Sequence, residues 1–436
     1  MAERAEGAAA QGHAALRPHV APAASHSQRV SLATMFDSFR IRSFRYQWSA
    51  DAVSVWASEM ENLVLGWYII AETGSAFQTG LLAALRFGGT LIAPLYGVMA
   101  DRMNRRKMLV GMRLIFAGQA AVMMALALTG ALHPWHAFVL SFLIGLVRQG
   151  EQVVRQSLIA DTVPRDRLMN ATGLARTTQD LSRMAGSFLG AGLLSQLGLG
   201  QAYIGVTCFF FVSALLALGI TLKQGVRVRP LTSPMENLRT GASYMRRDRT
   251  IVAVMFLAFL VNFTTFPLTN GLLPVVAKQV FDMGPTGLAT LTAVTAVGAL
   301  VGSLAMAAVS SRAARPDRLM IVGIIAWHVT VLAFSQVHGL GLALLVLSLY
   351  GAAMSFSMVT MSTLLLETTE AEFRGRVMGV RMLAVYGLPM GLLLGGVLSD
   401  RYNVQTATLI LGLIGIGMLV AALVAWPELW RKRPAR

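Results

Sequence analysis

The stretch Gly97-Val98-Met99-Ala100-Asp101-Arg102-Met103-Asn104-Arg105-Arg106-Lys107 decides the fold of this chain. It places four cations and one Asp in a short turn between two long apolar runs. Both runs are hydrophobic enough to span a bilayer, so the turn is predicted to lie in water between two membrane helices. Asn104 is expected to supply the turn, because Asn tolerates the left-handed backbone conformation.

The composition extends this interpretation to the whole chain. Of 436 residues, 55% are hydrophobic and 13% are charged, and the mean hydropathy is +0.60. These values exclude a soluble protein and indicate an all-α, multi-pass membrane protein. The single cysteine, Cys208, excludes an intramolecular disulfide. Residues 1–30 contain no continuous apolar core, so no cleavable signal peptide is expected.

Twelve apolar spans of roughly 20 residues follow, each long enough to cross about 30 Å of hydrocarbon. We place them at about 46–71, 78–99, 108–129, 137–159, 168–195, 201–222, 250–276, 286–309, 319–336, 341–365, 376–399 and 405–426. The segment 223–249 separates a six-helix bundle at 46–222 from a second at 250–426. Weak internal similarity at equivalent places predicts that the two bundles are pseudo-symmetric around a central cavity.

The distribution of charge predicts the orientation in the membrane. The formal net charge is +16, but the cations lie in short loops rather than on one water-facing surface, which argues against a nucleic-acid partner. Most of the 37 Lys and Arg fall in alternate loops and in the two tails, and only Lys278 and Arg401 fall in loops on the other side. The positive-inside rule therefore places both termini in the cytoplasm.

Both ends of the chain are predicted to be cytoplasmic tails, at 1–45 and 427–436. Aromatic and Arg residues alternate from Phe36 to Trp48, which suits a short interfacial helix at the lipid headgroups. A flexible leader with aromatics close to the membrane is the alternative.

The basic turn resembles the loop between helices 2 and 3 of the major facilitator superfamily, with the pattern Gly-x-x-x-Asp-Arg-x-Gly-Arg-Arg. The matching residues are Gly97, Asp101, Arg102, Arg105 and Arg106, while Asn104 replaces the usual Gly. The segment Arg374-Gly375-Arg376-Val377-Met378-Gly379 and the turn Thr73-Gly74-Ser75 are similar to a branch that contains drug and siderophore exporters, enterobactin exporters among them. The resemblance covers about residues 40–426.

The resemblance implies a conformational latch at the cytoplasmic face. Asp101 would meet the N-terminal end of the helix that begins near Arg374, Gly375 and Arg376, and Arg102 or Arg105 would meet Asp161. The latch would hold when the transporter is open outward. The alternative is that these charges only enforce topology.

Ionisable residues also occur inside the spans, where each needs a partner or an aqueous cavity. The acids are Asp51, Glu59, Glu61, Glu151 and Asp180, and the bases are Arg86, Arg113, Arg148, Arg155, Arg176, Arg183 and Arg381. The resemblance assigns nearly all of them to helices that line the central cavity; Arg113 lies near the cytoplasmic end of helix 3, which faces lipid in the family. The second half contributes Arg381, Asn262, Asn270 and Tyr386, so its wall is expected to be mostly apolar and aromatic.

Depth along the helices predicts three placements. Counted from the cytoplasmic end, Asp51 is level with Arg155, and Glu59 and Glu61 are level with Arg148, so these groups are expected to pair. Asp180 is expected close to the same layer. Glu59 and Glu61 are about 200° apart around a helix, so only one of them can face the cavity.

Two interpretations of these charges stay open. Glu59, Glu61 or Asp180 could exchange a proton against substrate, since a carboxylate beside Arg can switch between paired and protonated forms. The pairs could instead be permanent braces between helices. The fifth helix reads Gly186-Ser187-Phe188-Leu189-Gly190, whereas antiporters of the family often carry Gly-Pro-x-x-Gly-Gly there, so antiport has less support than membership.

The resulting prediction is a twelve-helix secondary transporter of a bacterial inner membrane, not an enzyme, which works by alternating access as a monomer. It would export a small amphipathic compound of the drug or siderophore type in exchange for protons, and the Arg surplus hints at anionic or catecholate oxygens. No His spacing suggests a metal, no cofactor is expected, and no phosphate-binding loop suggests ATP. The alternatives are an importer or uniporter of the same fold, and a receptor or regulatory protein that transports nothing.

Overall fold

The computed structural model describes residues 37–164, 168–221, 239–240, 243–246, 248–310, 316–370, 373, 377 and 381–430. A short 3₁₀ turn, η1, spans Asp37–Arg40, and every helix after it belongs to one compact unit, Ser38–Arg436. The described residues contain helices and turns and no strand, which confirms the predicted all-α class.

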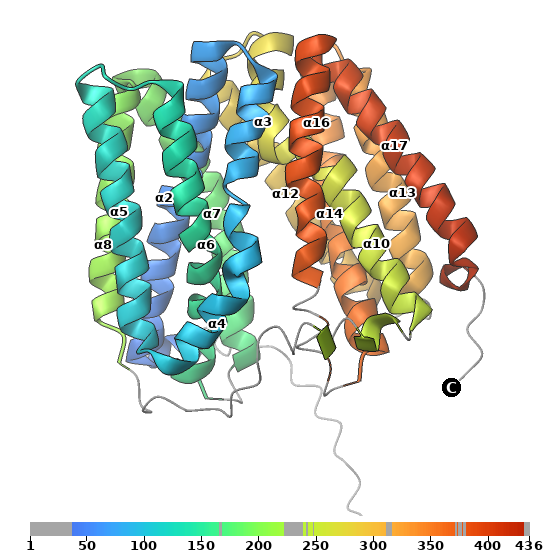
Figure 1. Cartoon of the computed structure of the whole chain (residues 1–436), viewed down its shortest axis with the longest axis horizontal. Helices are drawn as coiled ribbons and strands as arrows, with labels where there is room; N and C mark the ends of the chain where they lie inside the picture. Colours follow the sequence, from blue (N-terminus) through green and yellow to red (C-terminus); the bar gives the residue numbers. More distant parts are fainter. Residues whose placement is uncertain are drawn as a thin grey trace, which may run out of the picture. The chain divides into compact units, whose positions relative to one another are not determined.

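The first bundle contains six crossings, drawn from blue to green in Figure 1. Its elements are α2 (Arg42–Thr73), α3 (Ala76–Leu85), η2 (Gly88–Ile92), α4 (Ala93–Arg102), α5 (Arg105–Leu128), α6 (Pro134–Thr162), α7 (Leu168–Leu197) and α8 (Leu199–Leu218). The second crossing is built from α3, η2 and α4, so its helix is interrupted by a 3₁₀ turn near its middle.

The second bundle repeats this arrangement, from yellow to red in Figure 1. Its elements are α10 (Arg249–Thr264), η4 (Leu268–Leu272), α11 (Leu273–Val275), η5 (Val276–Val280), α12 (Pro285–Ser310), α13 (Pro316–Ser335), α14 (Leu340–Thr368), η6 (Met382–Tyr386), α16 (Gly387–Arg401), α17 (Val404–Ala425) and η7 (Pro427–Leu429). Two π-helical turns, η4 and η5, interrupt its first crossing. The fold is therefore the predicted pair of six-helix bundles.

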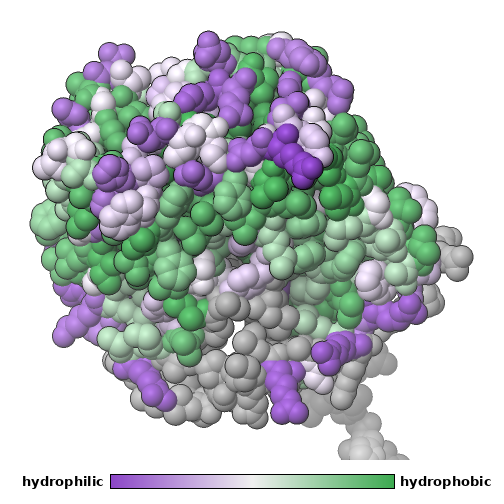
Figure 2. Space-filling model, turned by 45° about the horizontal axis from the view of Figure 1, so that its top comes forward, coloured by the Kyte–Doolittle hydropathy of each residue, from purple (hydrophilic) through white to green (hydrophobic). Residues whose placement is uncertain are grey.

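Judged by length and composition alone, eight stretches among the described residues are long and apolar enough to cross a membrane. The crossings outside this group are α2, the α3–η2–α4 segment, α7 and the η6–α16 segment. They are the charged or interrupted ones, because α2 and α7 carry several ionisable residues and the other two are broken by 3₁₀ turns. Figure 2 shows hydrophobic side chains forming a band across one face of the molecule, with hydrophilic residues above and below it.

Two local features differ from the sequence expectation. The first crossing begins at Arg42 rather than near residue 46, so the aromatic and basic residues from Arg42 to Trp48 form the first turns of α2. Asn104 is not left-handed: its φ is −67°, and its side chain accepts a hydrogen bond from the Lys107 amide as the N-cap of α5. The segment between the bundles lies mostly outside the described residues.

Small residues allow the bundles and helices to approach closely. A Cβ atom added at Gly80 of α3 would lie 2.6 Å from the carbonyl oxygen of Leu392 in α16. Within the first bundle, a Cβ atom at Gly190 of α7 would lie 2.8 Å from the Cα atom of Met60 in α2. Helix α3 therefore packs along α16 across the two bundles, and α7 packs on α2, as expected for small residues at membrane helix interfaces.

Candidate functional site

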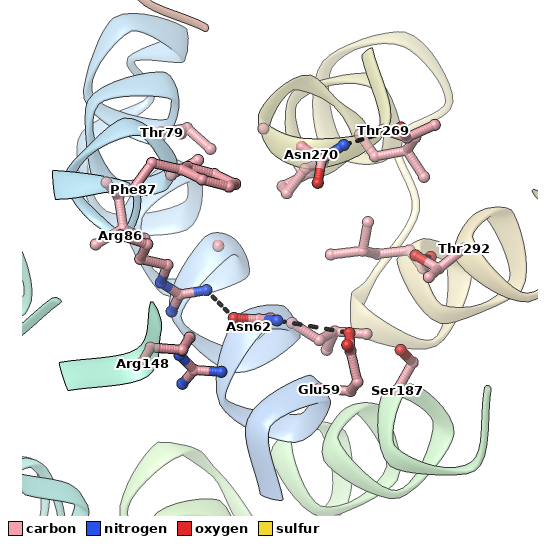
Figure 3. A pocket seen from close by; sticks show the side chains of 18 of the residues that line it. Glu59, Asn62, Thr79, Arg86, Phe87, Arg148, Ser187, Thr269, Asn270 and Thr292 are labelled. Atoms are coloured by element: carbon pink, nitrogen blue, oxygen red, sulfur yellow. Dashed lines mark hydrogen bonds between the residues drawn. The ribbon is translucent and has the colours of Figure 1, made fainter. Parts of the chain in front are cut away.

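A cavity of about 230 Å³ lies between the two bundles. Residues of α2, α3, α6 and α7 line it from the first bundle, and residues of η4, α11 and α12 line it from the second. Figure 3 shows polar side chains directed into it from both sides. The labelled ones include Glu59, Asn62, Arg86, Arg148 and Asn270. This cavity is the predicted central cavity of the fold.

Among the residues that the structure describes, Glu59 is the carboxylate that lines this cavity. Its side chain is 22% exposed, and its Oε1 atom lies 3.5 Å from Nε of Arg183, whose side chain is 46% exposed. Asn62, one turn further along α2, donates from Nδ2 to the second Glu59 oxygen at 3.5 Å. Glu59 therefore lies next to both a cation and a hydrogen-bond donor while remaining open to the cavity.

Glu61 points the other way, as the 200° separation predicted. Glu61 is only 2% exposed, and its Oε2 atom accepts a hydrogen bond from Arg148 Nη2 at 3.1 Å. This confirms the predicted pairing of Arg148 with one of the two acids. The Arg148 guanidinium also lies 5.6 Å from the centre of the Phe116 ring, which adds a cation–π contact. The pair braces α2 against α6.

Arg86, near the end of α3, is a cavity residue that the sequence analysis noted only as an intramembrane base. Its Nη1 atom donates to Asn62 Oδ1, so α3 and α2 are joined at the cavity wall. Its Nη2 atom and the Nε atom of Arg148 are both buried and have no hydrogen-bond partner among the described atoms. Arg86 follows Thr79 by seven residues, so both lie on one face of this crossing. That spacing could have indicated that Arg86 lines the same cavity as Thr79.

A second charged cluster lies between α2, α5 and α6. Arg113 is completely buried and pairs with Asp51 and, at 3.2 Å, with Glu151. The predicted pairing of Asp51 with Arg155 is therefore wrong, because Arg113 occupies the place opposite Asp51. Helix α5 was assigned to the lipid side, yet Arg113 lies on its inner face and compensates two acids that would otherwise be costly to bury.

Asp51 and Arg155 nevertheless line a common space. A cavity of about 260 Å³ lies between α2, α6 and α7, entirely within the first bundle. Its wall is rich in amides and aromatics, including Gln47, Trp48 and Gln179. The indole Nε1 of Trp48 donates to Thr178 at 2.9 Å, which ties α2 to α7 beside this cavity.

Of the residues predicted for the cavity in the second bundle, most lie elsewhere. Asn262 donates to Ala258 O of its own helix, and Arg381 donates to Ser362 Oγ at 2.7 Å; neither lines the central cavity. Tyr386 lies on η6 and is also absent from its wall. Asn270 does line the wall, together with Thr269 and Thr292, so this wall is apolar and hydroxylated rather than aromatic. The side chains of Arg176 and Asp180 lie outside the described set.

The predicted latch is only partly within the described residues. Arg105 pairs with Asp161 at 2.6 Å, which confirms the contact expected between Asp161 and either Arg102 or Arg105. Arg105 also donates from Nε to Ala100 O at 3.0 Å. We call this region the Arg105 end of the bundles. The segment 374–376, the surroundings of Gly97 and the side chain of Asp101 lie outside the description, while Arg102 is exposed and Arg106 half-buried.

Polar contacts that the sequence analysis missed join the bundles at the opposite end, called here the Asp400 end. The Asp400 carboxylate accepts from Ser75 Oγ at 2.6 Å and from the Ala76 and Phe77 amides at 2.6 and 3.1 Å, and so caps the N-terminus of α3. The Lys278 ammonium donates at 3.0 Å to Ile70 O at the C-terminus of α2. Both charges suit the dipole of the helix end that they contact.

His328 has a structural role between two helices of the second bundle. It is fully buried, and its Nε2 atom lies 3.0 Å from Thr264 Oγ1, while Nδ1 lies 2.8 Å from Ile324 O. It therefore joins α13 to α10. Within the described part of the chain, no group of three or more His, Cys, Asp or Glu is arranged to hold a metal ion.

Comparison with known sequences identifies the family of the fold. The sequence profile of the Major Facilitator Superfamily matches residues 48–391, with a second match over 255–436. Macrolide efflux protein A of Streptococcus pyogenes is 23% identical over 367 residues, covering 82% of this chain and 89% of that protein. Multidrug efflux pump Tap of Mycolicibacterium fortuitum is 24% identical over 371 residues, with 82% and 89% covered. Multidrug resistance protein MdtG of Salmonella choleraesuis is 25% identical over 368 residues, with 82% and 86% covered.

Solved structures agree with this assignment of the fold. A bacterial homologue of the human lysosomal transporter Spinster superimposes with a TM-score of 0.73 at 15% identity, over 92% of this chain and all of that one. The nucleoside transporter NupG gives a TM-score of 0.71 at 15% identity, over 90% of this chain and all of that one. At such low identity these structures support the fold alone.

Proposed function

The chain belongs to the Major Facilitator Superfamily and is a multi-pass membrane transporter of a small molecule; from this premise we propose that it exports an amphipathic organic compound in exchange for protons. The observation that carries the proposal is the cavity shared by the two bundles, with the half-buried carboxylate of Glu59 in its wall. The efflux proteins among its relatives favour export over import.

Glu59 is the best candidate for the proton-carrying group. Glu61 and Glu151 are nearly inaccessible and already paired with Arg148 and Arg113, so they act as braces in this proposal. Glu59 is accessible from the cavity and lies beside the Arg183 cation. It can therefore pair with Arg183 when ionised and lose this pair when it binds a proton. The two interpretations of the intramembrane charges therefore apply to different residues.

Alternating access requires that the two ends of the cavity close in turn. The Asp400 and Lys278 contacts join the bundles at one end, which supports a state that is closed there. The positive-inside rule places this end outside the cell, because Lys278 and Arg401 are the cations of its loops. We place both termini in the cytoplasm of a bacterium and the helices in its inner membrane, and a single chain suffices to form the cavity.

The proposal is tested with purified protein in liposomes that carry an imposed pH gradient. A labelled macrolide is the first probe, because a relative is named for macrolide efflux. We expect wild-type flux to follow the pH gradient and Glu59→Gln to remove that dependence while still exchanging substrate across the membrane. Flux with no response to pH would favour a uniporter. Flux of substrate in the same direction as protons would favour an importer. Folded protein that transports none of a panel of amphipathic compounds would favour a receptor.

A further inference from the structure

The central cavity holds two guanidinium groups whose hydrogen-bonding capacity is not fully used. Arg86 and Arg148 both line the cavity, from α3 and from α6. Figure 3 draws them on the same wall, one turned toward Asn62 and the other beneath it. Each keeps a buried N–H group without an acceptor among the described atoms, at Nη2 of Arg86 and at Nε of Arg148. A buried donor without a partner is costly, and for a charged group the cost is larger.

The backbone fixes this pair in place. A Cβ atom added at Gly145 of α6 would lie 2.8 Å from the Arg86 carbonyl oxygen, so α3 and α6 are in direct contact at this level. Arg148 follows Gly145 by three residues and therefore projects from the same face of α6. The two cations are thus held close by packing, in spite of their mutual repulsion.

The acids near this pair compensate only one of the two charges. Glu61 is paired with Arg148, and Glu59 with Arg183. Arg86 donates to the neutral amide of Asn62 and, among the described groups, forms no ion pair; Glu61 and Glu59 attract it from a distance while each is paired with another Arg. An uncompensated cation inside a membrane protein indicates a missing anion or a water-filled cavity.

From these observations the geometry points to Arg86 and Arg148 as a receptor for an oxyanion, such as a carboxylate, carried by the transported molecule. The two guanidinium groups line the cavity and would supply charge-assisted hydrogen bonds to the anion. Leu273, Pro274 and Leu288 form the facing wall from the second bundle, and they suit a compact apolar body. The substrate class is therefore an amphipathic organic acid, and this inference rests on the proposed role of the cavity in transport.

The test compares two small ligands that differ only in charge, 2-naphthoate and the neutral 2-naphthamide. Binding is measured by calorimetry in nanodiscs of phosphatidylcholine at one constant pH, so no transport or gradient is involved. We expect wild type to bind naphthoate about ten- to a hundredfold more tightly than naphthamide, the range for hydrogen bonds to charged groups. Arg86→Gln should remove this preference, and Arg86→Lys should retain most of it.

Arg45→Gln is the matched control, because it removes one exposed cation of the same bundle outside the cavity and should leave the preference intact. Naphthamide binding by Arg86→Gln reports that this variant is folded. Equal binding of the two ligands by wild type, no binding of either, or an unchanged preference in Arg86→Gln would overturn the inference.

A lipid headgroup could supply the same oxyanion. Repeating the titration with phosphatidylglycerol in the nanodiscs separates the two sources. Competition by phosphatidylglycerol that depends on Arg86 would identify the occupant as lipid and overturn the assignment to substrate, whereas unchanged naphthoate affinity supports it. Failure of pH-driven flux in liposomes would remove the proposed export function and leave this binding result standing, so the two claims fail separately.

Discussion

Glu59 Oε1 lies 3.5 Å from Nε of Arg183, at the wall of a cavity shared by both bundles. The neighbouring acid Glu61 is buried against Arg148 instead. Two carboxylates separated by one residue on α2 therefore have different environments: one is open to the cavity and the other is buried in an ion pair. This difference underlies the predictions for proton coupling.

Removal of Arg183 should change the pH dependence of transport without abolishing it. Arg183 is the cation beside the Glu59 carboxylate, so Arg183→Gln removes an ion pair that forms only when Glu59 is ionised. The response of flux to an imposed pH gradient should therefore differ from that of wild type. Arg42→Gln, an exposed substitution at the start of α2, serves as the control. An unchanged pH dependence in Arg183→Gln would contradict the assignment of Glu59.

Arg113 should be critical for stability. Arg113→Gln leaves Asp51 and Glu151 buried without their cation, and breaking a buried pair costs about 3–5 kcal/mol. We expect a large loss of folded protein, measured by thermal unfolding in detergent. The triple variant Asp51→Asn, Arg113→Gln, Glu151→Gln should recover part of the loss, because the two buried acids are neutral, while Arg155 beside them keeps its charge. A triple variant no more stable than Arg113→Gln would show that the charges are not the cause.

The Asp400 contacts should stabilise the state that is closed at their end. Asp400→Ala removes three hydrogen bonds to the start of α3, and charged hydrogen bonds contribute about 1.5–3 kcal/mol, or about tenfold or more in population. Spin labels on the two bundles at this end should report a longer distance in a larger fraction of molecules. Arg401→Gln, the exposed neighbour, should leave the distribution unchanged. An unaltered distribution in Asp400→Ala would exclude a gating role.

The pair at the Arg105 end should respond unequally to substitution of its two partners. Asp161 is partly exposed, so Asp161→Asn should cost at most about 1 kcal/mol. Arg105→Ala also removes the hydrogen bond to Ala100 O at the end of α4 and should cost more. Thermal unfolding of both variants checks this order, and equal effects would show that the contact with Ala100 contributes nothing.

The sequence predicted the fold because hydropathy and the positions of cations specify membrane crossings directly. Depth counting also placed Arg148 against one of Glu59 and Glu61, since both helices were anchored at one end by their loops. The same method assigned Arg155 to Asp51 because Arg113 was set aside with a helix expected to face lipid. Rotation of a helix about its axis decides such a pairing, and depth carries no information on rotation.

Contacts between segments that are distant in the chain could not be predicted from the sequence, for a different reason. Asp400 reads as an ordinary loop residue, and only the packing of α16 along α3 brings it to the amides of Ala76 and Phe77. Arg86 was visible as a charge in a span, but its unused N–H group depends on the side chains around it. Such features require the positions of helices relative to one another.

The central claim is that the cavity between the bundles opens to each side of the membrane in turn. The single native cysteine, Cys208, can be replaced by Ser, so that Thr292→Cys in the cavity wall becomes the only thiol. Labelling by a membrane-impermeant maleimide is then measured from either side of oriented membranes. The account predicts labelling from the cytoplasmic side in the resting protein and increased labelling from the outside when Asp400→Ala is added. Labelling from neither side, or from one side only in both proteins, would contradict it.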